Sequence, residues 1–106
     1  MEKKTITAAQ EFNEESFSKI NVFEEENSTL FVINFLPGQQ MPEHNHPGRE
    51  LYLHVIKGSG RFIIDGAAIG VTEDDVIHIG PEEKISFVND SEDRASIYVT
   101  MSRIHQ

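Results

Sequence analysis

The sequence predicts an all-β domain, built as a sandwich or as a jelly-roll barrel. Roughly eight or nine short segments rich in Val, Ile, Phe, Thr and Tyr recur along the chain, and these residue types favour strands. Gly, Pro, Asn and Asp separate the segments, as they do in turns. This spacing is typical of antiparallel sandwiches and barrels, and not of a parallel sheet with crossover helices.

The first expected element is one short helix over residues 7–15, followed only by strands. Thr7 can serve as the N-cap of this helix, because the Ala, Gln and Glu residues that follow it are good helix formers. A charged turn is expected at residues 24–28. The predicted strands are residues 19–23, 29–36, 51–56, 61–64, 67–71, 76–79, 85–88 and 95–101.

Turn signals connect the later strands. Asp65-Gly66 predicts a two-residue hairpin loop with positive φ at both positions. Other turns are expected at residues 58–60, 80–81 and 89–91. We expect a single domain over residues 1–106, with an N-terminal arm at residues 1–18 and the barrel at residues 19–102.

Composition and charge narrow the class of protein. The chain has 106 residues, with 18 acidic and nine basic side chains and a net charge of −9, which disfavours nucleic-acid binding. There is no cysteine, so disulfides and thiolate metal ligands are excluded. No signal peptide or membrane-spanning stretch is evident, and we expect a cytoplasmic protein without a membrane partner.

Residues 38–58 carry a pattern of possible metal ligands. His44 and His46 are two residues apart, so on an extended chain they point to the same side. A Pro-Gly turn follows, after which Glu50 can begin the next strand and point toward the same site as the two histidines. Such a set of two histidines and one carboxylate leaves coordination positions open, as in non-haem iron oxygenases.

This stretch resembles the first motif of the cupin family, G-x5-H-x-H-x3,4-E-x6-G. Gly38, His44, His46 and Glu50 fit its spacing, whereas seven residues separate Glu50 from Gly58 where the pattern has six. The resemblance implies a jelly-roll barrel, also called a double-stranded β-helix. It also implies a divalent metal, Fe, Mn, Ni, Co or Zn, on His44, His46 and Glu50.

The second cupin motif, G-x5-P-x-G-x2-H-x3-N, is weaker here. Anchored on Asn89, it places Ile85 where the family has its fourth metal ligand, a histidine. An apolar side chain at position 85 favours a pocket wall that excludes water, and this predicts an apolar small-molecule pocket. The expected lining residues are Tyr52, Phe62, Ile85, Phe87 and Tyr98, for which plain core packing is the alternative.

Several strands are apolar on both faces, for example residues 29–36 and 51–56. A barrel interior buries only one face, so we expect a homodimer that covers the other. The alternative is that the N-terminal segment covers it.

Two functions remain open from the sequence. The first is a metal-dependent cupin enzyme, such as an oxygenase or an isomerase, acting on a small molecule. The second is a metal-free small-molecule-binding or sensor cupin without catalytic activity. The sequence names no catalytic residue and no substrate.

Overall fold

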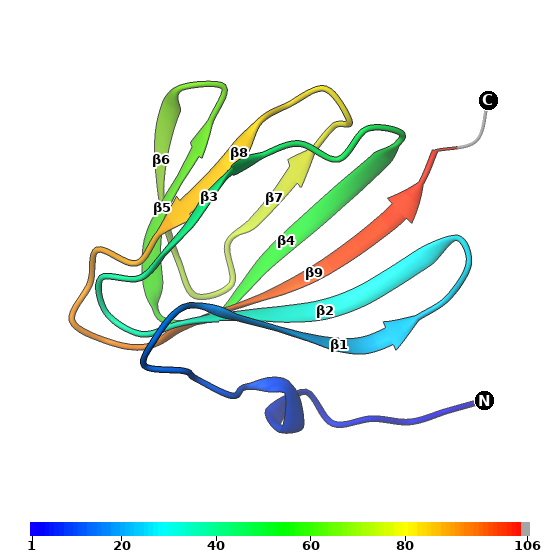
Figure 1. The fold of residues 1–106 in the computed structure, drawn as a ribbon, viewed down its shortest axis with the longest axis horizontal. Coiled ribbons are helices and arrows are strands. Elements are labelled where there is room, and N and C mark those ends of the chain that lie inside the picture. The colour runs from blue at the N-terminus through cyan, green and yellow to red at the C-terminus, as the bar shows by residue number, and fades with distance from the viewer. Residues whose placement is uncertain (105–106) are drawn as a thin grey trace.

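The protein folds into two antiparallel sheets that face each other across a common core (Figure 1). The computed structural model describes residues 1–104. One sheet has five strands in the order β1-β2-β9-β4-β7, and the other has four in the order β3-β8-β5-β6. The described elements are the 3-10 helix η1 (Ile6–Ala9) and the strands β1 (Ser18–Glu24), β2 (Ser28–Phe35), β3 (Gln40–His44), β4 (Arg49–Lys57), β5 (Ser59–Ile64), β6 (Ala67–Thr72), β7 (Val76–Ile79), β8 (Ile85–Val88) and β9 (Ala95–Arg103).

The predicted all-β jelly roll is confirmed by this topology. The last strand, β9, lies between β2 and β4, so that strands distant in sequence pair within one sheet. Strand β3 was not predicted, because its sequence is largely polar and contains Pro42. It lies at the edge of the four-stranded sheet, where proline is tolerated.

The predicted helix over residues 7–15 is wrong. The only helical turn in the described residues is η1, and Thr5 rather than Thr7 precedes it without a side-chain cap. Barrel side chains bond the carbonyls that a longer helix would use. The Nδ2 group of Asn34 donates to the Ala9 carbonyl at 2.8 Å, and the Oγ group of Ser18 donates to the Glu11 carbonyl.

The main core fills the space between the sheets with alternate residues of each strand. Phe35 and Phe62 both pack against Phe87, with ring centroids 4.7 Å apart in each pair. Aliphatic side chains from β4 and β9 complete this core. Several side chains of this core also line the cavity described below.

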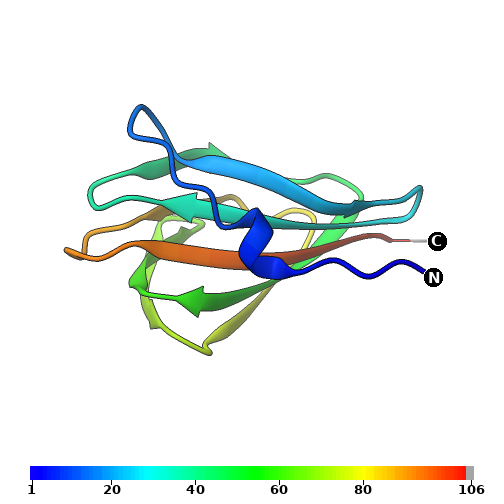
Figure 2. The same ribbon diagram turned by 90° about the horizontal axis from the view of Figure 1, so that it is seen from below.

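The arm covers part of the outer face of the five-stranded sheet (Figure 2). Ile6 and Ala9 pack there against a second apolar cluster that includes Val32 and Tyr98. The arm therefore buries part of the second apolar face. The homodimer stays a prediction. No helix in the described part of the chain is both long and apolar enough to cross a membrane.

The Asp65-Gly66 hairpin is confirmed. The φ angles are 49° at Asp65 and 85° at Gly66, as expected for a loop with positive φ at both central positions.

Gly60→Ala is expected to destabilise the fold by about 1–3 kcal/mol, the range for overpacking a core. A Cβ at Gly60 would lie 2.3 Å from Cζ of Phe87 and 2.7 Å from the Val88 carbonyl oxygen. Urea denaturation measures the change. Gly70→Ala is the matched control, since its Cβ would meet nothing within 4 Å, and equal effects of the two variants would contradict this packing.

Candidate functional site

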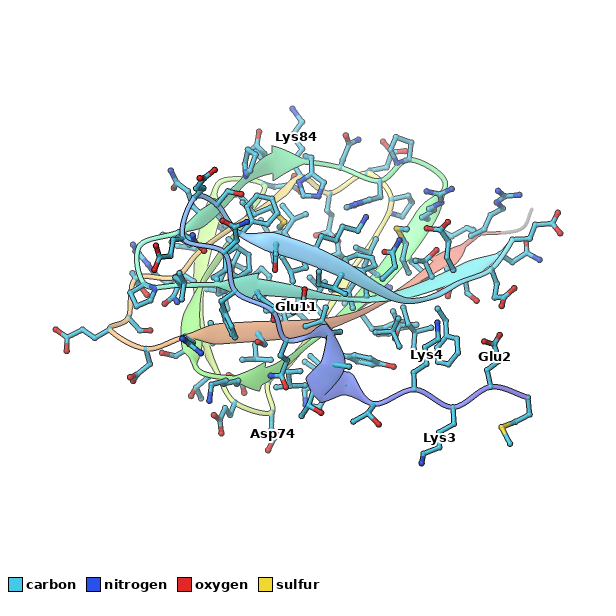
Figure 3. All side chains as sticks on the ribbon, turned by 60° about the horizontal axis from the view of Figure 1, so that its bottom comes forward. Glu2, Lys3, Lys4, Glu11, Asp74 and Lys84 are labelled. Atoms are coloured by element: carbon cyan, nitrogen blue, oxygen red, sulfur yellow. The ribbon has the colours of Figure 1, made fainter. Side chains whose placement is uncertain are left out.

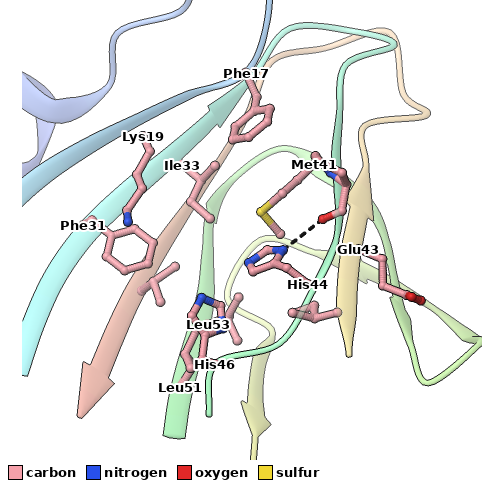
Figure 4. A pocket seen from close by; sticks show the side chains of 13 residues that line it. Phe17, Lys19, Phe31, Ile33, Met41, Glu43, His44, His46, Leu51 and Leu53 are labelled. Atoms are coloured by element: carbon pink, nitrogen blue, oxygen red, sulfur yellow. Dashed lines mark hydrogen bonds between the residues drawn. The ribbon is translucent and has the colours of Figure 1, made fainter. Parts of the chain in front are cut away.

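A cavity of about 220 Å³ opens between the sheets, and its wall is mainly apolar (Figure 4). Side chains from β1, β2, β3, β4, β8 and β9 line it, together with residues next to β1 and β3. The lining residues are Phe17, Lys19, Phe31, Ile33, Met41, Pro42, Glu43, His44, His46, Leu51, Leu53, Ile85 and Val99. Lys19, His44 and His46 supply nitrogen atoms to this apolar surface.

A bulge in β3 turns His44 toward the cavity. Met41 pairs with Phe87 and His44 pairs with Ile85, so three steps along β3 match two steps along β8. Without the extra residue, strict alternation would place His44 on the face opposite Met41. The irregularity therefore brings the imidazole to the same side as the core.

The hydrogen bond of His44 assigns its tautomer. Its Nδ1 atom lies 2.9 Å from the Pro42 carbonyl oxygen, and because a carbonyl can only accept, Nδ1 carries the proton. In the neutral ring, Nε2 is then an acceptor. Figure 4 shows this second nitrogen pointing into the cavity.

His46 lies beside His44, with ring centroids 4.6 Å apart and an interplanar angle of 74°. Its Nδ1 atom is buried and has no hydrogen-bond partner within residues 1–104. The pKa of His46 is lowered from 6.5 to about 4, mainly because burial disfavours the charged ring. Charge repulsion from His44, Lys19 and Arg49 contributes the rest of this shift. His46 is therefore neutral at pH 7.

Glu50 does not join the two histidines. Its carboxylate accepts a hydrogen bond from Nε2 of His78, at 3.0 Å, on the outer face of β4 and β7. Across the described residues, no group of three His, Cys, Asp or Glu side chains lies close enough to hold a metal ion. The predicted set of three ligands is thus not assembled.

The two-residue period of β4 explains the position of Glu50. Leu51 and Leu53 point into the cavity, so their neighbours Glu50 and Tyr52 point out. Leu51 also satisfies the family spacing better than Glu50, because it lies five residues after His46 and seven before Gly58. An apolar residue therefore occupies the position at which the motif has its carboxylate.

The donor set does not fit a cupin metal ion. Two imidazoles remain, while Leu51 and Ile85 stand at the positions of the other two ligands. Glu43 lies at the rim, and Figure 4 shows its carboxylate directed away from both histidines. A divalent cation here would lack the anionic oxygen that the two-histidine, one-carboxylate arrangement supplies.

Of the five predicted lining residues, Ile85 lines the cavity. Phe62 and Phe87 lie in the packed core beyond it. Tyr52 is 46% exposed on the outer face, 4.9 Å from the His78 ring, and Tyr98 packs beneath the arm. Even positions on β4 and β9 face outward, which is why both tyrosines lie away from the cavity.

Sequence reasoning missed Lys19 and most of the apolar lining. Lys19 pairs with Ile33 across β1 and β2, and paired residues share a face. Because Ile33 faces the cavity, this register places Lys19 at its rim. The apolar residues at positions 31, 33 and 35 indicated the inward face, but the pairing register that joins Lys19 to it was not visible in the sequence.

Comparisons with known proteins agree with this fold. A family model described as a cupin domain matches residues 31–101. The TT1209 protein from Thermus thermophilus is 21% identical, with a TM-score of 0.91 over 97% of this chain and 98% of that one. An uncharacterized conserved protein with a double-stranded β-helix domain from Klebsiella pneumoniae is 16% identical, with a TM-score of 0.91 over 97% and 90% of the two chains. An RmlC-like cupin protein from Desulfovibrio desulfuricans is 27% identical, with a TM-score of 0.85 over 96% of each chain. No curated protein matches the sequence.

The free energy of unfolding is expected to decrease as the pH falls from 6.5 toward about 4, because of His46. In this window the unfolded chain binds a proton at this imidazole and the folded protein does not. His46→Phe should therefore show a smaller loss of stability than the wild type between these pH values. NMR should find the midpoint of the His46 ring titration near pH 4, and a midpoint near 6.5 would contradict the burial described here.

Leu51→Glu combined with Ile85→His is expected to raise Zn²⁺ affinity by at least about tenfold, equivalent to about 1.4 kcal/mol. The two substitutions add donors on the same side as His44 and His46. Competition with a chromophoric chelator measures the change. Glu50→Gln in the double variant is the control and should leave affinity unchanged, whereas a loss of binding would show that Glu50 reaches the metal.

Proposed function

The chain belongs to the cupin family, and from this premise we propose that it is a small-molecule-binding cupin that holds its ligand in the barrel cavity without a metal ion. Two features of the cavity support this proposal. Its wall is apolar, with Leu51 and Ile85 at the positions where the family has metal ligands, and Nε2 of His44 is available as a hydrogen-bond acceptor in the neutral ring. An apolar cavity with a few directed polar groups is the usual form of a small-molecule site.

The apolar wall supplies affinity and His44 supplies orientation. Removing apolar ligand surface from water contributes roughly 25 cal/mol per Å² before the costs of association. A hydroxyl or N–H group on the ligand can donate to Nε2 of His44, which has no partner among the described residues. We therefore expect a ligand with an apolar body and at least one hydrogen-bond donor.

A metal-dependent oxygenase or isomerase receives less support from the same residues. Such an activity requires a first coordination shell, and here Glu50 is bonded to His78 on the other side of β4. The two imidazoles are instead suited to hydrogen bonding with a ligand. Binding and sensing are therefore the roles that this donor set favours.

Binding of 3-phenylpropanamide provides the test, because this probe joins an apolar ring to an N–H donor. Titration should perturb the methyl NMR signals of Ile33, Leu53 and Val99, which line the cavity. Leu51→Trp, which fills the cavity from β4, should weaken binding by at least about tenfold, through lost volume.

Ile69→Trp is the matched control, since Ile69 is 45% exposed and lies outside the cavity lining. This variant should bind the probe like the wild type. Circular dichroism checks that both variants are folded. Equal binding by the wild type and Leu51→Trp, or no binding by the wild type, would overturn the proposed function.

A further inference from the structure

Lys19 places an unpaired positive charge at the rim of the apolar cavity. Its Nζ atom lies 4.4 Å from the centroid of the Phe31 ring, and both residues line the cavity (Figure 4). Among residues 1–104, no carboxylate lies within ion-pair distance of Lys19. The other lysines of the described residues share this lack of an ion pair, so what distinguishes Lys19 is its position in the lining of the cavity.

The surroundings of His46 show the same local excess of positive charge. Besides His44, the charged groups that lower the pKa of His46 are Lys19 and Arg49. Arg49 also has no ion-pair partner within the described part of the chain. Lys19 is thus the cationic side chain among the described lining residues, whereas the carboxylate of Glu43, which also lies at the rim, is directed away from both histidines.

The histidine tautomer decides where an anionic group can lie. In the neutral ring, Nε2 of His44 is an acceptor, so a carboxylate placed against it would bring two acceptors together. The Lys19 ammonium group has three donors and no acceptor. An anionic group therefore favours the Lys19 side of the rim, while the apolar body of the ligand occupies the space beneath.

From this arrangement we propose that the cavity selects an apolar organic anion, with its charged group held by Lys19. The inference rests on the proposed function, because it names the chemical class of the ligand of that same cavity. A lysine on the inner side of an edge strand also discourages pairing with another sheet edge. That role alone gives no preference for charge in a ligand.

The experiment compares 3-phenylpropanoate with 3-phenylpropanamide, which have the same shape. At neutral pH the acid carries a negative charge, and it lacks the N–H donors that the amide offers to His44. Calorimetric titration of the wild type at neutral pH should show the acid binding about threefold to tenfold tighter, the range of a partly exposed charge pair. In Lys19→Met, which keeps an apolar stem, the net negative charge of the protein should reverse this order. Added salt should weaken binding of the acid and leave that of the amide nearly unchanged.

Lys84→Met is the matched control, since Lys84 projects from the surface outside the cavity lining (Figure 3). It should keep the wild-type preference, and Lys19→Arg should keep a preference for the acid. If the amide binds in the cavity as tightly as the acid, the anion inference is overturned and the proposed function stands. If neither probe binds, both are overturned.

Discussion

The two-residue period of the strands is the constraint on which both the core and the cavity depend. It places Leu51 and Leu53 of β4 inside the barrel and therefore directs Glu50 outward. The same period on β3 is broken by a bulge, which brings His44 inward beside Met41. One extra residue in β3 thus admits an imidazole to the cavity, and the regular register at the start of β4 keeps the carboxylate out.

A few polar groups interrupt a cavity wall that is otherwise mostly apolar. Burial keeps His46 neutral, and the Pro42 carbonyl fixes the proton of His44 on Nδ1. The Nε2 acceptor of His44 and the Lys19 ammonium are the groups of the rim that suit the donors and the negative charge of the ligand that we propose. A metal ion in the same place would require an anionic ligand on β4, where the chain provides leucine.

The outer face of the five-stranded sheet has one part that the arm covers and one part that stays exposed. The arm covers the part around Val32. Asn34 holds the arm in place by donating a hydrogen bond to the Ala9 carbonyl. Ser96 donates to the Oδ1 atom of Asn34 at 2.8 Å, so both ends of this buried amide are bonded. Tyr52 and Val76 remain 46% and 59% exposed on β4 and β7, and this uncovered part is where the predicted second subunit would pack.

The sequence by itself determined the all-β fold, most strands, the Asp65-Gly66 hairpin and the cupin resemblance, because apolar periodicity and turn residues act locally. The sequence also predicted that His44 and His46 lie together, since they are only two residues apart. Only the tertiary structure decided which residues share the cavity. Glu50 and Leu51 are adjacent, and the pairing register of β4 with β9 sends them to opposite faces. Lys19 reaches the cavity through pairing with β2, and the arm avoids a longer helix because Asn34 and Ser18 bond the Ala9 and Glu11 carbonyls. These outcomes depend on partners distant in the chain, which local sequence patterns do not specify.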